Sequence, residues 1–350
     1  MKIISSILVI LILQLYTVWG SITSIYLPTK IFQEIQTCEN DNFHHPISEH
    51  QVVSQIDCSR LCTSVGECRQ FMFDKQTKLC SLFEAGENCF SAGDIQHKVC
   101  YRQKSVCNSK KCSRCPVGYY GDQCENIIVD CKDGRDRSVV PIKEGRRSYI
   151  QPSANGPVIE VMCDFKWGKT LLMRRTSLCK EVNFNRTWNE YVMGFGSIHG
   201  EYWLGLENVF NIIQNFPTRD DNALNVILKV GNTPVSQCYY MGFKISNYSD
   251  NYAVSISFYS GGKTPSGDSL TNGIYSINGR PFSTYDRDQT SHNCPGRFNG
   301  GWWYLDDPVC SQANIFGRRS GDTYESTCHW QEDFGLETDF SWIEMAFKRW

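Results

Sequence analysis

A repeating pattern of apolar and polar positions predicts one helix and one hairpin in the first third of the chain. Four apolar residues spaced by three and four positions share one helix face: Cys58, Leu61, Cys62 and Val65. The sequence Ser54-Gln55-Ile56-Asp57 has the spacing of a capping box before this helix, and Gly66 is expected to end it. Two short apolar runs then predict strands at 70–73 and 79–83, joined by the polar turn 74–78.

The rest of the chain is typical of a larger, mostly antiparallel domain. Strict alternation over 252–259 predicts one continuous strand, with four side chains on the same face: Tyr252, Val254, Ile256 and Phe258. A final strand is predicted from three alternating apolar residues, Ile343, Met345 and Phe347. One amphipathic helix interrupts the strands, with a helical rhythm at Trp188, Tyr191, Val192 and Phe195. Thr187 and Glu190 form its capping box, and Gly194 or Gly196 ends it, so the fold class expected is α+β.

Residues 1–20 have the pattern of a secretory signal peptide. Lys2 supplies a positive charge, an apolar run follows from Ile3 to Leu13, and Val18 and Gly20 are the small residues before the expected cut. An uncleaved membrane anchor is the alternative. Because no later segment approaches the about 18 uncharged apolar residues of a spanning helix, we expect a secreted, extracellular protein without a transmembrane segment.

Cysteine usage divides the remaining sequence into three parts. Of 18 cysteines in 350 residues, seven lie between Cys38 and Cys100, four between Cys107 and Cys124, and seven from Cys131 onward. Small modules need cross-links because their cores are thin, whereas a large domain can rely on burial. We therefore expect two small disulfide-rich modules followed by one large domain, in an oxidising compartment. The net charge of −2 argues against a nucleic-acid partner.

The first module, at residues 21–104, resembles the PAN/apple family. The segment CSRLCTSVGECRQFMFDKQTKLC, with a helix joined to a small hairpin through its cysteines, carries the resemblance. The family's usual pairing implies the bridges Cys58–Cys80, Cys62–Cys68 and an outer Cys38–Cys100, and leaves Cys89 unpaired. Spacing alone leaves the connectivity open. The resemblance also implies a binding face for a protein or carbohydrate partner.

The second segment, at residues 105–126, is similar to part of an EGF-like repeat. Cys115-Pro116-Val117-Gly118-Tyr119-Tyr120-Gly121-Asp122-Gln123-Cys124 looks like the final loop of such a repeat, which implies a Cys115–Cys124 bridge. The segment has fewer cysteines than a full repeat, so it is interpreted as a rigid spacer. A zinc site made by the segment's four cysteines is the alternative: Cys107, Cys112, Cys115 and Cys124.

Residues 127–350 resemble the fibrinogen-related domain of ficolins, tachylectins and tenascins. Short motifs in the family's order carry the resemblance: Asn183-Phe184-Asn185-Arg186-Thr187-Trp188, Gly194-Phe195-Gly196, Gly200-Glu201-Tyr202-Trp203-Leu204-Gly205, Gly267-Asp268-Ser269-Leu270, Phe282-Ser283-Thr284-Tyr285-Asp286, Asn293-Cys294, Gly301-Trp302-Trp303-Tyr304, Cys310 and Glu344-Met345. The resemblance implies a mainly antiparallel fibrinogen C-terminal-like domain with the bridges Cys131–Cys163 and Cys294–Cys310.

Three cysteines of this domain are additions to the family's pattern. They are Cys179, Cys238 and Cys328, and the pairing Cys179–Cys238 is a guess. Since Cys89 is also left over, an intermolecular bridge, which would give a disulfide-linked oligomer, and a bridge between modules are open alternatives.

The resemblance also implies a Ca²⁺ site just before Cys294. Asp286 and Asp288 fall at the positions of its carboxylate ligands, and Thr290 and His292 fall where backbone carbonyls contribute. A hard cation prefers such oxygen ligands, and two carboxylates suit weak binding of extracellular calcium. The alternative is an empty turn in which Arg287 pairs with one of the carboxylates.

A neighbouring pocket is where lectins of this family hold acetylated sugars. The residues expected around it are Trp303, Tyr304, Val309, Cys310, Ser311 and Arg319. Ser311 and Arg319 differ from the family's usual histidine and tyrosine, so Arg319 could favour an anionic ligand instead. The alternative for Trp302 and Trp303 is that they simply fill the core.

These features predict a binding protein rather than an enzyme. Gly267-Asp268-Ser269-Leu270 matches a lipase nucleophile block, but no downstream Asp-x-x-His follows it. Asn185 and Asn247 begin glycosylation sequons, and Asn247 is the better candidate.

The leading hypothesis is a secreted, calcium-dependent, lectin-like protein that binds glycans or acetylated or anionic surface ligands in innate immune recognition. The alternative is a matrix adhesion protein or receptor ligand with a protein partner. A toxin or clotting modulator is a third hypothesis, supported only by the wide range of functions within the family.

Overall fold

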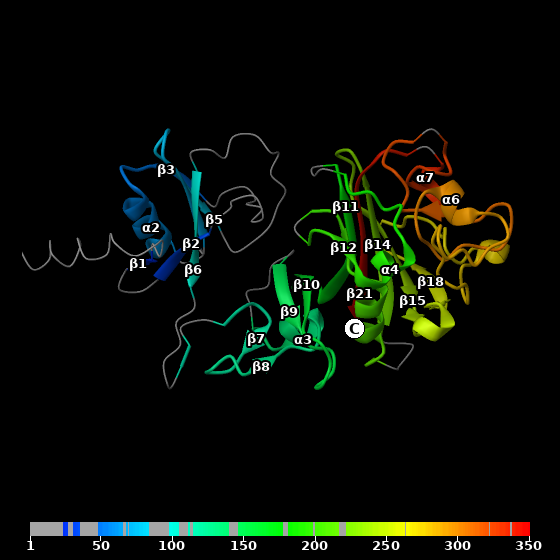
Figure 1. Cartoon of the computed structure of the whole chain (residues 1–350), viewed down its shortest axis with the longest axis horizontal. Coiled ribbons are helices and arrows are strands. Elements are labelled where there is room, and N and C mark those ends of the chain that lie inside the picture. Colours follow the sequence, from blue (N-terminus) through cyan, green and yellow to red (C-terminus); the bar gives the residue numbers. More distant parts are fainter. Residues whose placement is uncertain are drawn as a thin grey trace, which may run out of the picture. The chain divides into compact units, whose positions relative to one another are not determined.

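The chain divides into two compact units, shown in Figure 1. The computed structural model describes residues 24–26, 31–35, 48–65, 68, 70–83, 98–104, 111–112, 115–139, 146–177, 181–198, 200–216, 222–262, 264–321, 323–336 and 338–350. The first unit holds the described residues up to 104 and the second those from 111 onward. The expected signal peptide at 1–20 lies outside the described residues. No helix among the described residues is both long and apolar enough to cross a membrane.

The first unit is one antiparallel sheet with a helix packed on two of its strands. The sheet has the strand order β1-β2-β6-β4-β5-β3. Helix α2 (Gln55–Ser64) contacts β4 and β5. The side chain of Ser54 accepts the Asp57 N–H at its start, so the helix and the hairpin predicted from the sequence are confirmed. The strands are β1 (Ser24–Tyr26), β2 (Ile31–Ile35), β3 (Ser48–Gln51), β4 (Gln70–Asp74), β5 (Leu79–Phe83) and β6 (Lys98–Lys104).

Two disulfides hold this small unit together. Cys58–Cys80 links α2 to β5, and Cys62–Cys68 closes the short loop after the helix. Both bridges lie in a small core with Phe71. Because this core has few apolar residues, cross-links that restrict the unfolded chain contribute much of its stability. Cys38 and Cys89 lie outside the described residues.

The second unit has an α+β architecture centred on a nine-stranded antiparallel sheet. Seven of its strands follow the order β12-β13-β11-β21-β14-β15-β18. The other two are β10, which pairs with β11, and β9, which pairs with β10. Strand β21 lies between β11 and β14, as Figure 1 shows, and its apolar alternation is the predicted final strand. The strands are β9 (Arg146–Ile150), β10 (Ile159–Asp164), β11 (Lys169–Thr176), β12 (Phe195–Gly196), β13 (Tyr202–Trp203), β14 (Asn222–Val230), β15 (Ser236–Met241), β18 (Phe258–Gly261) and β21 (Phe340–Arg349).

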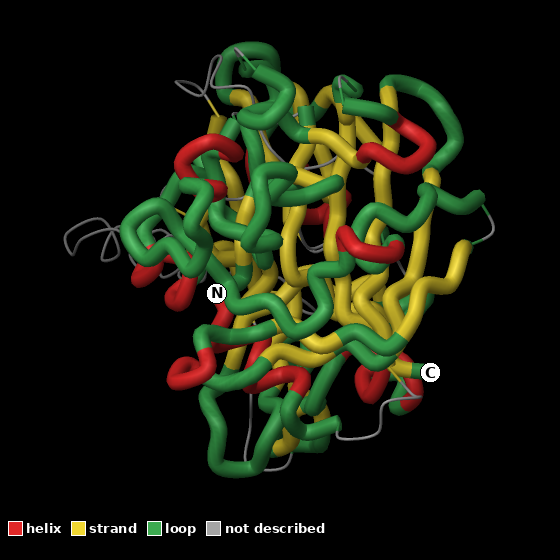
Figure 2. The backbone as a smooth tube through the Cα atoms, turned by 90° about the vertical axis from the view of Figure 1, so that its right-hand side faces the viewer, coloured by secondary structure: helices red, strands yellow, loops and turns green. Residues whose placement is uncertain are grey.

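Long loops and short helices surround this sheet, as Figure 2 shows. Minor pairs of strands are β7 (Tyr119–Tyr120) with β8 (Asn126–Ile127), β16 (Lys244–Ile245) with β17 (Val254–Ser255), and β19 (Ala313–Asn314) with β20 (His329–Trp330). The helices are α3 (Cys131–Asp136), α4 (Trp188–Met193), α5 (Leu206–Ile213), α6 (Cys294–Phe298) and α7 (Gln331–Phe334), with 3₁₀ turns η1 (Tyr248–Asp250) and η2 (Gly273–Tyr275).

Helix α4 begins and ends where the sequence predicts. Thr187 accepts the N–H of Glu190, and the Glu190 side chain accepts the N–H of Thr187, so the capping box is complete. Gly194 ends the helix at φ 90°, a conformation that glycine adopts at little cost.

The single strand predicted over 252–259 is wrong. Its residues form two short strands in different sheets: β17 pairs with β16, and β18 pairs with β15. Tyr252 precedes both at a positive φ of 49°, and the side of the backbone that faces inward switches at Ser257. Phe258 is consequently 56% exposed, while Tyr259 contacts Tyr240 of the core. The pairing of β18 with β15, rather than the local alternation, fixes which side chains face inward.

Residues 115–128 pack against the large domain. The Tyr149 N–H donates to the Val117 carbonyl (2.9 Å), and the Ile128 N–H donates to Gly118 (2.9 Å). The Cys115–Cys124 bridge closes the loop between, and Gly118 has no room for a side chain because a Cβ there would lie 1.9 Å from the Tyr149 carbonyl oxygen.

Candidate functional site

The loop closed by Cys294 and Cys310 carries most of the positions expected to bind a ligand. Helix α6 begins at Cys294, and the bridge ties this end to Cys310, whose φ is 60°. Asp307 holds the returning backbone, because its side chain accepts the N–H groups of Val309 (2.8 Å) and Cys310 (3.1 Å). The bridge and these hydrogen bonds fix the loop in one shape.

Four of the residues expected to bind a ligand here are buried. Trp303 and Tyr304 are each 1% exposed, and Cys310 and Ser311 are also buried. Trp303 Nε1 donates to the Tyr252 carbonyl (2.8 Å), and the Tyr304 hydroxyl donates to the Gly300 carbonyl (2.8 Å). Ser311 Oγ donates to the Ala313 carbonyl (2.8 Å). Trp302 and Trp303 therefore fill the core, which is the alternative that the sequence left open, and Tyr304 is buried with them.

Arg319 is not a free cation either. Its guanidinium donates to the Thr176 carbonyl and lies 3.1 Å from Glu201 Oε1, with only 17% of the side chain exposed. The suggestion that Arg319 receives an anionic ligand is therefore corrected: its charge is neutralised within the protein. Of the six residues expected around the pocket, Val309 is the one that is largely exposed, at 42%.

Three residues that sequence reasoning missed are linked to the segment before Cys310 through Arg297. Arg297 of α6 donates to Pro308 (3.0 Å) and pairs with Glu325 (2.5 Å), and Tyr324 is 47% exposed beside Glu325. Glu325 raises the pKa of Arg297 by accepting its hydrogen bond. Arg297 and Glu325 are 28 residues apart, and no local pattern marks such a pair. We call Arg297, Val309, Tyr324 and Glu325 the disulfide-loop surface.

The residues of the expected calcium site divide between two structural roles. Asp286 Oδ1 accepts the Trp188 N–H at the start of α4 (2.8 Å) and the Thr284 hydroxyl (2.8 Å). Asp288 Oδ1 accepts the N–H and the hydroxyl of Thr290 (2.8 Å each). Asp306 holds the next residue of the loop, since its carboxylate accepts from Ser291 (2.7 Å). His292 follows in the same loop.

This donor set fits calcium only in part. Within the described ranges, no three His, Cys, Asp or Glu side chains gather as a metal site would require. Because Asp286 Oδ1 is bonded to the start of α4, we expect Asp288 and the carbonyls of Thr290 and His292 to be the ligands that remain for a cation. The alternative pairing of Arg287 with a carboxylate is not what the structure contains. Arg287 lies 4.1 Å above the Trp188 ring and donates to Asn251 Oδ1 (2.6 Å).

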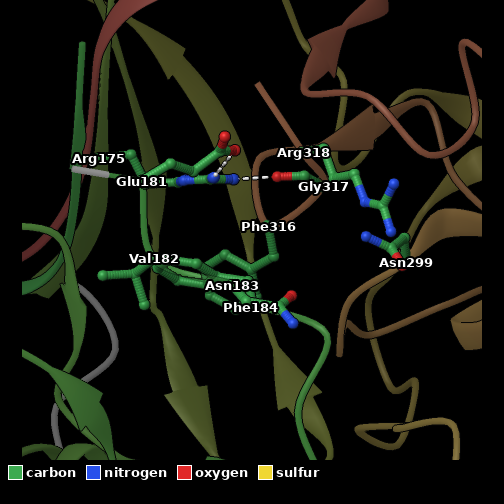
Figure 3. A pocket seen from close by; sticks show the side chains of 9 residues that line it. All are labelled: Arg175, Glu181, Val182, Asn183, Phe184, Asn299, Phe316, Gly317 and Arg318. Carbon is green, nitrogen blue, oxygen red and sulfur yellow. Dashed lines mark hydrogen bonds and ion pairs between the residues drawn. The ribbon is translucent and has the colours of Figure 1, made fainter. Parts of the chain in front are cut away.

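A second exposed feature is a pocket at the end of β11, shown in Figure 3. It encloses about 470 Å³ of empty space, part of it open to solvent. Arg175 and Glu181 form one side, Asn299 and Arg318 lie across from them, and two phenylalanines line it between. The lining residues are Arg175, Glu181, Val182, Asn183, Phe184, Asn299, Phe316, Gly317 and Arg318.

A buried ionic network supports the Arg175 side of this pocket. Glu201 is fully buried, and its carboxylate accepts the N–H groups of Thr176 (3.0 Å) and Val182 (2.8 Å). It also lies close to both Arg319 (3.1 Å) and Arg175 (3.8 Å). Four charged side chains from distant segments therefore neutralise one another: Arg175, Glu181, Glu201 and Arg319. The sequence singled out Glu201, within the Gly200–Gly205 motif, and Arg319, but it did not predict that they pair.

The two glycosylation sequons differ in exposure. Asn247 is exposed at the start of η1, and its Oδ1 accepts the Ser249 hydroxyl (2.7 Å). Its amide nitrogen, the atom to which a glycan is attached, takes no part in this bond. Asn185 is half-buried with its Oδ1 enclosed. Asn247 therefore stays the better candidate, and glycopeptide mass spectrometry finding a glycan only at Asn185 would contradict it.

Comparison with known proteins gives one family model and many relatives. The model described as "Fibrinogen beta and gamma chains, C-terminal globular domain" matches residues 129–349. Human angiopoietin-related protein 6 is 35% identical over 185 residues, covering 50% of this chain and 36% of that protein. The fibrinogen alpha chain of Gallus gallus is 33% identical over 204 residues, covering 54% and 26%. Tenascin-R of Gallus gallus is 30% identical over 204 residues, covering 56% and 14%.

Solved structures match the same part of the sequence. The fibrinogen-like globe domain of human ANGPTL6 has a TM-score of 0.54 and 29% identity, covering 64% of this chain and 96% of that one. Lamprey fibrin D-dimer, solved with the peptide Gly-His-Arg-Pro-amide, has a TM-score of 0.53 and 23% identity, covering 63% and 73%. The curated relatives are much longer than their match, because the chain spans 36% or less of each of the three named above.

Proposed function

Because this protein belongs to the family of C-terminal globular domains found in fibrinogen beta and gamma chains, we propose that it is an extracellular adhesion protein or receptor ligand that binds a protein partner. The disulfide-loop surface carries this proposal. Tyr324 and Val309 are exposed there, beside the ion pair of Arg297 and Glu325. An exposed aromatic side chain beside paired charges is typical of the residues that dominate protein interfaces.

Similar proteins support a protein partner over a sugar. The matches include angiopoietin-related proteins and tenascin-R, which favours the adhesion and receptor-ligand hypothesis. The aromatic side chains expected to hold an acetylated sugar, Trp303 and Tyr304, are instead parts of the core. Extracellular localisation is part of the proposal, supported by the signal-peptide pattern and by the disulfides of both units.

A non-enzymatic role is also proposed. Ser269, the one residue matching a lipase nucleophile, is 1% exposed, and its hydroxyl accepts the Glu332 N–H (2.9 Å). A serine in this position cannot reach a substrate without moving the α7 segment.

The calcium-dependent lectin in innate immune recognition is the second candidate. Its support is the loop of Asp288, whose Oδ2 and the nearby carbonyls of Thr290 and His292 offer oxygen ligands. We propose that any Ca²⁺ bound by this protein binds there. A calcium-dependent signal on an array of acetylated and anionic glycans would favour this candidate.

Binding of the secreted full-length protein to cultured cells, before and after enzymatic removal of their glycans, tests the leading proposal. We expect saturable binding that survives both deglycosylation and a calcium chelator. Tyr324→Ala should weaken it about 10-fold or more, as loss of a central aromatic contact does. Tyr285→Ala, which changes a tyrosine of similar exposure (50%), is the matched control. Binding that disappears with the glycans would overturn the proposal.

A further inference from the structure

We propose that the pocket between Arg175 and Arg318 binds a carboxylate, presented as an aspartate or glutamate side chain of the protein partner. The inference rests on the proposed function for the nature of the partner, and otherwise on the pocket's own charges and donors. The disulfide-loop surface is a separate feature, since it shares no residue with the pocket lining.

The pocket has one positive charge that the protein does not neutralise. Arg175 lies 3.1 Å from Glu181, and Arg319 lies 3.1 Å from Glu201, so these four charges cancel. Arg318 is exposed, and its guanidinium makes no hydrogen bond or ion pair with the residues that the structure describes. Figure 3 shows this guanidinium beside Asn299, across the pocket from Glu181. A planar guanidinium pairs well with a carboxylate because two of its N–H groups can donate in parallel.

The backbone holds Arg318 and Asn299 in place before any ligand binds. The Arg318 N–H donates to Ser326 (2.8 Å), and its carbonyl accepts from Cys328 (2.7 Å). Asn299 has a φ of 56° directly after α6, a conformation that asparagine tolerates. Its Nδ2 is buried and has no partner among the described residues. An unpaired buried donor is costly, so an acceptor from a ligand would bind it favourably.

The remaining walls suit an acidic amino-acid side chain better than a sugar. Phe184 and Phe316, whose ring centroids lie 5.3 Å apart, line the pocket but are only 2% and 0% exposed, so they close its wall and present little surface to a ligand. Sugar hydroxyls need acceptors as well as donors. Glu181 is the charged acceptor of the pocket, but its Oε1 already accepts from Arg175 (3.1 Å) and from the Arg319 N–H (2.7 Å). The cavity volume, about 190 Å³, is below the about 300–1,000 Å³ of sites for drug-sized ligands, so it fits a short side chain better than a sugar ring.

Titration of the full-length protein with blocked amino acids, followed by NMR, tests the inference. The probes are the N-acetyl, N-methylamide derivatives of aspartate and glutamate, with the asparagine derivative as the uncharged control. We expect the acidic probes to bind with a Kd on the order of millimolar, as small ligands do. The asparagine probe should bind at least about 10-fold more weakly, and added salt should weaken the acidic probes. Equal binding of acidic and amide probes overturns the inference.

Two variants place the binding in this pocket. Arg318→Gln should weaken the acidic probes about 10-fold, whereas Arg60→Gln, an exposed arginine of α2 in the first unit, should leave them unchanged. Asn299→Asp replaces the amide donor by a repelling carboxylate of the same shape, and it tests the site even if Arg318→Gln fails to fold. Acidic-probe binding unaffected by a correctly folded variant of either kind overturns the inference.

A third probe distinguishes the source of the carboxylate. N-acetylneuraminic acid presents a carboxylate on a sugar, and tighter binding of this probe than of the blocked amino acids would overturn the assignment to a protein side chain. Because none of these probes needs the natural partner, their outcome is independent of the cell-binding assay. Cell binding that fails while the acidic probes bind would count against the proposed function and support the carboxylate site.

Discussion

At the level of single residues, the two aspartates of the Asp286-Arg287-Asp288 sequence have different structural roles. Asp286 reaches the first N–H of α4, whereas Asp288 stabilises its own loop through Thr290. Arg287 between them is held over Trp188 and bonded to Asn251. The loop is thus anchored by side-chain contacts on either side.

We expect Asp286→Ala to lower the free energy of unfolding by about 1–2 kcal/mol, because it removes an acceptor from an unpaired helix N–H and from Thr284. Urea unfolding with and without calcium measures the free energy of unfolding. The decrease caused by Asp286→Ala should be the same under both conditions. Asp288→Ala is the control, since it should abolish any calcium heat in calorimetry. A stability loss for Asp286→Ala that appears only when calcium is present would show that Asp286 is a ligand.

His329 gives the fold a pH dependence. Burial lowers the pKa of this histidine, whose Nδ1 lies near the Tyr324 (3.1 Å) and Thr327 (3.0 Å) carbonyls. Its Nε2 is buried and has no hydrogen-bond partner in the described part of the chain. The unfolded protein takes up a proton near pH 6.5, while the folded protein resists it until lower pH. The unfolded state therefore binds more protons in this window, so stability present above about pH 6.5 is lost as the pH falls.

We expect His329→Gln to flatten the decline in unfolding free energy between about pH 7 and pH 5. Urea unfolding across this range measures the slope, which does not depend on the absolute stability of the variant. His50→Gln, a change at an exposed histidine of β3, should leave the slope unaltered. If the free energy of unfolding declines with the same slope in His329→Gln as in the unmodified protein, His329 is not the source of the pH dependence.

At the scale of secondary-structure elements, the sequence predicted what is decided locally. Helices α2 and α4 and the β4–β5 hairpin follow from caps, turns and periodicity within about ten residues. The prediction of one continuous strand over 252–259 failed because the second half of this segment pairs with β15, and no local sequence pattern reveals that pairing. The family resemblance predicted a functional loop at Cys294, but it could not show which side chains of that loop are buried. The Arg175–Glu201–Arg319 network joins segments far apart in the sequence, so it had no sequence signal.

The capping box of α4 is a local feature that can be tested by itself. Thr187→Ala should lower the free energy of unfolding by about 1 kcal/mol, because the N–H of Glu190 loses its acceptor. Thr187→Ser keeps the hydroxyl and should retain most of the stability. Thermal or urea unfolding that finds the two variants equally destabilised would show that the methyl group, rather than the cap, matters.

Across the whole molecule, the described cysteines fall into bonded and free classes. Five bridges join both of their partners within the described residues, and Cys112 is also bonded. Cys238 and Cys328 are free and buried, so the guessed Cys179–Cys238 bridge is wrong. Cys179 lies outside the described residues. Burial raises the pKa of Cys238 to about 12 and that of Cys328 to about 11, which suppresses the reactive thiolate.

We expect Cys238 and Cys328 to resist alkylation at neutral pH in the folded protein and to react fully in denaturant without reductant. Peptide mapping by mass spectrometry measures both states, and alkylation of Met or Lys side chains is scored as the background. A non-reduced peptide that links Cys179 to Cys238 would contradict the structure directly.

The placement of β21 bears on how the protein is made. Among the strands that the structure describes, this one comes last in the sequence, yet it lies between β11 and β14 in the main sheet. While a ribosome has not yet released residues 340–349, those two neighbours present bare edges that can recruit foreign strands. A premature stop codon before residue 340 would therefore remove the middle of the sheet rather than trim its border, and the truncated product should aggregate.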